Sequence, residues 1–372
     1  MATATKERKK TRSGGITLSA ATLKAAMAAV SPAVPSRHAK PILANVLLAD
    51  GVLTATDLEV RINVEIDYHG PQLLLPHARL SAILSASGGE EVSLSQDGTS
   101  CTVTCGNGTW TLPTESAAEF PTWMPENAQP LTRLPADQFC RAVRGTVYST
   151  DDESSRYALG AVLVDVSDGT VTFVATDGRR LSACEMEHDL AVNDSKTLVP
   201  SRAMSILAKA AGAAGDASVQ LEATANELIA TIGGTTVTAR LVQGSFPRWR
   251  DVIPADGASP STVLGADLLS ATRAAGIVTT ENSKGVQYTF TDAGLHLHGQ
   301  SSEAGESSVT CDLVEFGHKC TVKLDPAYVR EWLSGLPADG EPTVSVQATD
   351  AQSAVVLRTD SFTGVIMPLA LD

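Results

Sequence analysis

Histidines, cysteines and aspartates at regular spacings are the residues of this sequence with most potential for chemistry. His296 and His298 lie two positions apart in an expected strand, so their side chains share one face. Cys101 and Cys105 share a strand face in the same way, but no further His or Cys stands at ligand spacing. We therefore interpret the histidines as exposed strand residues and the cysteines as structural residues rather than metal ligands.

Two aspartates occupy equivalent motifs. Asp57 and Asp177 each follow Ala-Thr and lie 120 residues apart. This pattern favours turns held by Thr and Asp side chains over a catalytic pair. The sequence also lacks a Walker A loop, a GxGxxG motif, an HExxH motif and a nucleophile elbow. We therefore expect a protein that is not an enzyme and that has no metal or other cofactor.

The composition indicates a globular protein with reduced thiols. The chain has 372 residues, 43% of them hydrophobic, and no apolar stretch reaches the roughly 18 residues of a membrane helix. The cysteines form no CxxC pair and stand at positions 101, 105, 140, 184, 311 and 320. Residues 1–15 form a basic tail without the apolar core of a secretory signal. We expect this tail to be disordered, with nucleic-acid contact as the alternative, and we expect a cytoplasmic location.

A unit of about 125 residues recurs along the chain, as expected for tandem domains. Segments 45–66 and 161–187 both contain alternating strands around an Asp-Gly turn, followed by Ala-Thr-Asp and another alternating strand. Phe-Pro pairs at 120 and 246 end two of the units.

Two helices are predicted in each unit. The opening helices are expected at 19–30, 136–147 and 266–277, and Asp137 and Asp267 suit an N-cap or first turn. The second helices are expected within 73–89, 197–212 and 322–340, where Pro stands in the first turn and Gly past the end. The predicted fold is α+β, with antiparallel sheets and three domains, at 16–133, 134–258 and 259–372.

Charge is distributed unevenly between these helices and the rest of the chain. A formal net charge of −14 argues by itself against binding to nucleic acid. The six predicted helices nevertheless carry an excess of bases: Lys24, Arg79, Arg141, Arg144, Arg202, Lys209, Arg273 and Arg330. If all six helices face one surface, that surface is positive. Ordinary solvated helix faces are the alternative interpretation.

An ordered set of motifs resembles the bacterial replicative sliding clamp, the β subunit of DNA polymerase III. The motifs are SRHAKPILANVLL, LTATDLEV, SRYALGAVL, ATDGRRLSAC, FPRWRDVIP, ADLLSATRAAG and the terminal VIMPLALD. The resemblance runs from about residue 16 to the C-terminus. It implies a head-to-tail homodimer, in which six similar domains form a ring with helices lining the hole. The implied partners are duplex DNA, bound without sequence preference, the replicative polymerase, the clamp loader and other proteins that carry a clamp-binding motif.

The resemblance also implies site residues. Arg37, Arg156 and Tyr157 match DNA-facing positions, with solvated loop residues as the alternative. An apolar pocket for a linear peptide between the second and third domains matches a larger set, for which simple core packing is the alternative. Its members are Leu159, Thr176, Gly178, Arg179, Arg180, Leu181, Pro247, Val252, Tyr328, Val365, Ile366, Met367, Pro368 and Leu369. Aliphatic side chains with a Met suit varied peptides, and Gly178 permits a positive φ.

For the dimer interface, Trp110 and Leu112 match apolar positions of the first domain, and Ile277 and Val278 match their partners in the third. An exposed Trp-x-Leu strand edge would otherwise invite aggregation. The sequence departs from the family in ending with Ala370, Leu371 and Asp372 instead of Arg-Leu. It also departs at Arg179, Asp251 and Ser283, positions that bear on the rim charge and the peptide preference of the pocket. A protein of this fold that serves interaction alone, without loading onto DNA, is the rival hypothesis to a working clamp.

Overall fold

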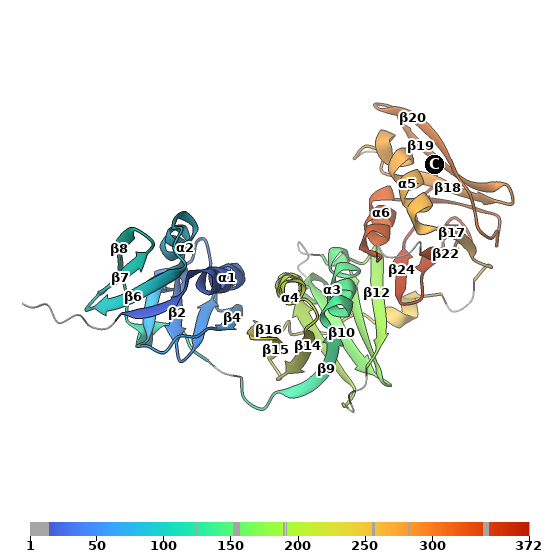
Figure 1. The fold of residues 1–372 in the computed structure, drawn as a ribbon. Helices are drawn as coiled ribbons and strands as arrows, with labels where there is room; N and C mark the ends of the chain where they lie inside the picture. Colours follow the sequence, from blue (N-terminus) through green and yellow to red (C-terminus); the bar gives the residue numbers. More distant parts are fainter. Residues whose placement is uncertain are drawn as a thin grey trace, which may run out of the picture. The chain divides into compact units, whose positions relative to one another are not determined.

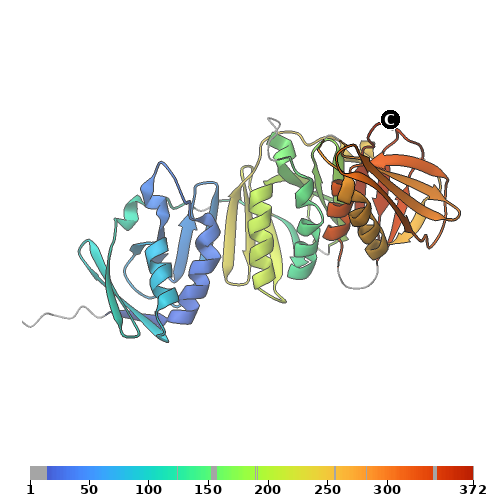
Figure 2. The ribbon, with the colours of Figure 1, turned by 90° about the horizontal axis from the view of Figure 1, so that it is seen from above.

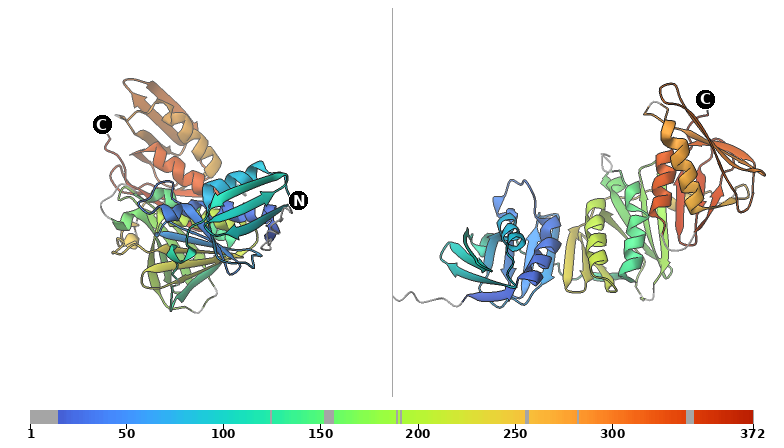
Figure 3. Two further views of the ribbon diagram at one scale, coloured as in Figure 1. Left: turned by 90° about the vertical axis from the view of Figure 1, so that its left-hand side faces the viewer. Right: turned by 45° about the horizontal axis from the view of Figure 1, so that its top comes forward.

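Three pairs of α-helices stand out in the computed structural model (Figure 1). The structure describes residues 15–123, 125–151, 157–188, 190, 192–254, 257–281, 283–337 and 342–371. Its α-helices are α1 (Ala20–Val30), α2 (His77–Ala86), α3 (Ala136–Arg144), α4 (Ser201–Ala213), α5 (Gly265–Ala275) and α6 (Pro326–Gly335). The two members of each pair lie side by side (Figure 2; Figure 3). The prediction of two helices per repeat is confirmed.

Side-chain caps fix the starts of two helices. Ser19 caps α1 by accepting a hydrogen bond from the backbone N–H of Thr22 at 3.3 Å. Asp325 caps α6 by accepting one from the N–H of Ala327 at 2.9 Å. Each cap satisfies a backbone donor that has no partner within the helix.

Prolines and acids mark other helix starts, with one correction. Pro326 is in the first turn of α6, as predicted, whereas Pro76 and Pro200 are the N-cap residues of α2 and α4, one step earlier than expected. A proline fits this position because the N-cap residue has an extended backbone. Asp137 and Asp267 lie in the first turns of α3 and α5, where the helix dipole favours an acid.

The chain forms two compact units, of which the first comprises residues 1–126 and 233–239. Its strands are β1 (Ile16–Ser19), β2 (Asn45–Ala49), β3 (Val52–Thr56), β4 (Val60–Glu65), β5 (Leu73–Pro76), β6 (Glu91–Asp97), β7 (Ser100–Cys105), β8 (Gly108–Pro113) and β16 (Thr235–Arg240). One antiparallel sheet has the order β1-β6-β7-β8, and β5, β2, β3, β4 and β16 are neighbours in a second sheet. Strand β8 is therefore an edge strand.

The second unit comprises residues 127–232 and 240–372 and contains both α3–α4 and α5–α6. Its strands are β9 (Gln129–Pro135), β10 (Ala161–Ser167), β11 (Thr170–Thr176), β12 (Arg180–Glu187), β13 (Ser195–Pro200), β14 (Ser218–Ala223), β15 (Glu227–Ile232), β17 (Ser261–Leu264), β18 (Val286–Thr291), β19 (Gly294–Ser301), β20 (Gly305–Cys311), β21 (Cys320–Leu324), β22 (Thr343–Gln347), β23 (Val355–Arg358) and β24 (Phe362–Ile366). An eight-stranded sheet has the order β13-β10-β11-β12-β24-β23-β22-β17, and a four-stranded sheet the order β20-β19-β18-β21. The pairing of β12 with β24 thus joins strands of the second and third sequence repeats.

The Thr-Asp turns have the structural role that the sequence predicted. Asp57 Oδ1 accepts hydrogen bonds from the N–H groups two and three residues later, at 3.0 and 2.7 Å. Asp177 Oδ1 accepts the equivalent pair, both at 2.9 Å. In the turn between β19 and β20, the hydroxyl oxygen of Ser301 accepts the corresponding hydrogen bonds from the N–H groups two and three residues later. The turn that begins at Thr176 also forms part of the candidate site, and Gly178 adopts the positive φ, 86°, that its position was expected to permit.

We predict opposite effects for two glycine substitutions. Gly178→Ala lowers the free energy of unfolding by about 1 kcal/mol, because an L-residue is strained at this φ although nothing lies near the added Cβ. Gly212→Ala, in α4 with room for a methyl group, raises it by about 0.5 kcal/mol. Urea denaturation followed by circular dichroism measures both. Equal effects of the two substitutions would contradict the assignment of strain to Gly178.

Candidate functional site

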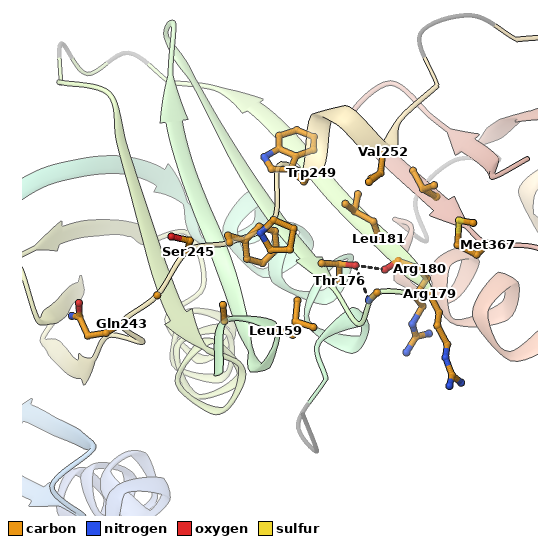
Figure 4. A pocket seen from close by; sticks show the side chains of 16 residues that line it. Leu159, Thr176, Arg179, Arg180, Leu181, Gln243, Ser245, Trp249, Val252 and Met367 are labelled. Carbon is orange, nitrogen blue, oxygen red and sulfur yellow. Dashed lines mark hydrogen bonds between the residues drawn. The ribbon is translucent and has the colours of Figure 1, made fainter. Parts of the chain in front are cut away.

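A hollow of about 740 Å³ opens on the second unit, over the sheet that contains β12 and β24 (Figure 4). Its lining comes from the 3₁₀ turn before β10, from the turn after β11, from β12, from the segment 243–252 and from the end of β24. The lining residues are Ala158, Leu159, Thr176, Gly178, Arg179, Arg180, Leu181, Gln243, Gly244, Ser245, Phe246, Pro247, Trp249, Val252, Val365 and Met367. Most of these are apolar, so the hollow suits an apolar ligand.

Alternation along neighbouring strands builds the apolar floor of this pocket. Leu181 of β12 stands opposite Val365 of β24 in the antiparallel ladder, and both are buried. The same core cluster includes Leu163 of β10, Val174 of β11 and Leu198 of β13. Successive side chains of a strand point to opposite faces, so these residues present one continuous apolar face.

Segment 243–252 crosses this face and is anchored at both ends. At one end the N–H of Val242 donates to the carbonyl of Leu198 at 2.9 Å. At the other, Trp249 is 6% exposed and its indole N–H donates to Asp165 Oδ2 at 3.3 Å. Arg250 donates to the same oxygen at 2.7 Å and stacks over the Trp249 ring at 4.2 Å. A buried carboxylate thus fixes the aromatic wall of the pocket.

Arg180 is the most heavily engaged charged residue of the pocket. Its Nε donates to Asp177 Oδ2 at 3.0 Å, and its Nη1 donates to Glu331 of α6. Its guanidinium also stacks on the rings of Tyr148 and Tyr328, at 5.3 and 4.4 Å. Burial by itself would lower the pKa of Arg180, but Glu331 and Asp177 raise it above its usual value. The Arg180 side chain therefore links strand β12 to helix α6.

The structure brings together most of the predicted pocket residues but not all. Tyr328, Ile366, Pro368 and Leu369 do not line the hollow. Ile366 is buried. Tyr328 does not contact the hollow itself, but its ring stacks on Arg180, which does line it. The sequence reasoning did not assign Ala158, Gln243, Gly244, Ser245, Phe246 and Trp249 to the pocket. For Phe246 and Trp249 a signal was present, since the repeated Phe-Pro motif contains both.

Of the described positions that depart from the family, one belongs to the pocket lining. Arg179 lines it and is exposed, whereas Asp251 borders a neighbouring hollow and pairs with Arg248 at 3.2 Å. Ser283 is outside the lining, as is Leu371, which is 39% exposed. Asp372 lies outside the described residues.

The predicted DNA-facing bases lie at the surface wherever the structure describes them. Seven of the eight helix bases are exposed: Lys24, Arg79, Arg144, Arg202, Lys209, Arg273 and Arg330. Arg141 is half-buried and contacts Asp137 at 3.6 Å. Arg37 is exposed in a loop. Arg156 and the side chain of Tyr157 lie outside the described residues.

The predicted interface residues lie at strand edges or close to them. Trp110 and Leu112 belong to edge strand β8, where Leu112 is buried in its own unit and Trp110 is half-buried. Leu112 is therefore less exposed than expected, because strand alternation turns it toward the core. Ile277, 78% exposed, and Val278 lie in a short 3₁₀ turn that contacts edge strand β20.

Nothing in the described parts of the chain indicates a metal centre. No group of three or more His, Cys, Asp or Glu residues there could hold an ion. Burial raises the pKa of the Cys184 thiol to about 12 and that of Cys311 to about 11, so both stay protonated and unreactive near neutral pH. Within the same residues, no helix is long and apolar enough to cross a membrane.

Comparison with known proteins assigns the chain to a family. The family model for the N-terminal domain of the DNA polymerase III beta subunit matches residues 15–124, and the model for its central domain matches residues 133–248. This chain belongs to the bacterial β sliding clamp family. It is accordingly a processivity factor of DNA polymerase III, a non-catalytic accessory subunit, as the sequence predicted.

Relatives extend this likeness over nearly the whole chain. The chain is 28% identical to the beta sliding clamp of Escherichia coli K12 and 27% identical to that of Proteus mirabilis, each over 92% of this chain and 96% of the relative. The solved β subunit from Pseudomonas aeruginosa aligns with a TM-score of 0.90 at 23% identity, over 96% of this chain and 100% of that one. The Bacillus subtilis sliding clamp aligns with a TM-score of 0.89 at 20% identity, over 96% and 99%. The fold of this family member is therefore that of the sliding clamps.

Two arginine substitutions should differ sharply in cost. Arg180→Ala lowers the free energy of unfolding by about 3 kcal/mol, because it leaves the largely buried Asp177 without its cation. Arg248→Ala removes another arginine paired with an aspartate three residues away, but its side chain is 91% exposed, so the cost stays below about 0.5 kcal/mol. Urea denaturation of the two variants measures the difference. Similar costs would show that the Arg180 network contributes no more than a surface ion pair.

Proposed function

We propose that this chain forms a two-subunit ring that encircles duplex DNA and holds its polymerase and other partners through peptides bound in the 740 Å³ pocket. The observation that carries the proposal is an apolar pocket with exposed apolar side chains at its rim, in a chain of the β sliding clamp family. The replicative polymerase and the clamp loader are the partners for which the family resemblance argues. A cytoplasmic location follows from that role.

The pocket has the chemistry of a peptide-binding cleft. Val252 is 51% exposed and Met367 is 48% exposed, so their burial by a ligand removes apolar surface from water. The polarizable, unbranched side chain of Met367 adapts to ligands of different shape. The Arg180 guanidinium is held by Asp177 and Glu331, which makes this wall of the pocket rigid. A short segment with apolar anchors is the ligand that such a cleft favours.

Binding to DNA depends on where the bases lie. The chain is acidic overall, at −14, yet the exposed bases of α1 to α6 outnumber the acids there. Lys and Arg side chains that contact phosphates give affinity without recognising the DNA sequence. A ring that binds DNA through such contacts can therefore slide along it. An acidic body discourages DNA from binding elsewhere on the protein. These features support the DNA-facing role of the helix bases and Arg37, and by resemblance that of Arg156 and Tyr157.

Ring closure is proposed to use the free edges of β8 and β20. Both are outer strands of four-stranded sheets, and each has backbone groups available to pair with another chain. Trp110 lies on the first edge, and the exposed Ile277 lies beside the second. Pairing between two subunits would cover both features. We keep the domain division 16–133, 134–258 and 259–372 as part of this proposal.

Substitution of one pocket valine should weaken peptide binding. Val252→Glu places a charge in the apolar pocket and should weaken binding of a polymerase-derived peptide at least tenfold. Val314→Glu is the matched control, since Val314 is 61% exposed and lies outside the pocket lining. Fluorescence anisotropy with labelled peptide measures both variants. Equal binding by the Val252 variant and the wild type would overturn the site assignment.

A second prediction concerns the oligomer. The wild type should show a mass of about 77.4 kDa (2 × 38.7) by light scattering at low micromolar concentration. Ile277→Glu should shift this mass toward 38.7 kDa, because a charge would be buried at the closed interface. The Val252→Glu variant should remain dimeric. A monomeric wild type would contradict ring closure through these edges.

A further inference from the structure

A second groove lies against segment 243–252, next to the peptide pocket. It has a volume of about 460 Å³ and is lined by Leu163, Lys196, Leu198, Gly244, Ser245, Phe246, Pro247, Arg248, Trp249, Arg250 and Asp251. Five of these residues, Gly244, Ser245, Phe246, Pro247 and Trp249, also line the peptide pocket. The two hollows therefore share this segment as a wall, and a chain that leaves one lies beside the other.

The charges of the groove differ from those of the protein as a whole. Two acids lie in or beneath it, and each is already paired: Asp165 with Arg250 at 2.7 Å, and Asp251 with Arg248 at 3.2 Å. Lys196 is exposed and makes no ion pair with any residue that the structure describes. The groove thus carries a local excess of one positive charge on a chain whose net charge is −14.

Arg250 is held in place but keeps donors for a ligand. Asp165 is 1% exposed and fixes Nη1, while the guanidinium stacks at 4.2 Å on Trp249. The Arg250 side chain remains 49% exposed. A guanidinium has five N–H donors, so several remain for a carboxylate, and the rigid stacking reduces the entropy cost of using them.

We propose that this groove binds an acidic stretch flanking the peptide that occupies the apolar pocket, an inference that rests on the proposed function. Carboxylates of the flank would meet Lys196 and the free donors of Arg250, while the apolar stems would cover Leu163 and Leu198. A peptide is favoured over a nucleic acid because the groove has apolar lining residues and adjoins the proposed peptide pocket. Attraction here, within an acidic surface, would select partners with acidic flanks and speed their association.

The test uses one polymerase-derived peptide with four Glu or four Gln residues added to either end. With the wild type, the Glu flank at one end should tighten binding about fivefold over the Gln flank at roughly 50 mM salt, with the gain much reduced at roughly 300 mM. Lys196→Gln should lose most of this gain and keep the affinity for the Gln-flanked peptide. Gln is preferred to Glu because Lys196 stands opposite Asp165 in the β10–β13 ladder. Lys319→Gln, an exposed lysine outside the groove, is the matched control and should keep the gain.

Several outcomes would overturn the inference. No gain from a Glu flank at either end, or the same loss in both lysine variants, would show that the groove does not bind the flank. A single-stranded oligonucleotide that displaces the Glu-flanked peptide only when Lys196 is present would identify a nucleic-acid site instead. If the Gln-flanked peptide fails to bind the wild type, the proposed function itself is wrong. That outcome is distinct from normal binding without a gain from the acidic flank.

Discussion

The antiparallel pairing of β12 with β24 is the constraint on which the candidate site depends. Five residue pairs, from Arg180 with Ile366 to Cys184 with Phe362, bring the C-terminal strand beside the second repeat. The ladder extends beyond the strand, since the N–H of Met367 donates to the carbonyl of Arg179 at 2.9 Å. Without this pairing, Val365 and Met367 would not meet Leu181, and the pocket would lose one wall.

Close packing behind β24 reinforces the pairing. A Cβ on Gly364 would lie 2.4 Å from the indole nitrogen of Trp332, so α6 approaches the strand as only a glycine permits. Arg180 lies on the same face of the sheet as Gly364 and joins β12 to Glu331 on the same helix. These contacts with α6 hold the strands beneath the pocket in place, which reduces the entropy cost of binding a flexible peptide.

The sequence was sufficient to predict local structure. Repeats near 125 residues predicted the six helices, and the Thr-Asp motifs predicted turns whose hydrogen bonds are equivalent at Asp57 and Asp177. Such features depend on neighbouring residues. Proline positions were less exact, because Pro fits both the N-cap and the first turn. For the site, family resemblance identified most of the lining.

Long-range features could not be predicted in the same way. Nothing local to β12 or β24 specifies their pairing across about 180 residues, because the register depends on complementary apolar faces. The stacking of Arg250 on Trp249 above Asp165 was missed for the same reason, since residues 84 and 85 positions apart must meet. The second groove follows from that contact.

Retention on DNA tests the account most directly. The wild type should be loaded by its clamp loader onto nicked circular DNA, remain bound through gel filtration, and be lost once the circle is cut. The Arg141→Glu, Arg144→Glu double variant should be retained less well on the circle while binding peptide normally. Equal retention of the wild type on circular and linear DNA, or no retention on either, would contradict a ring that encircles the duplex.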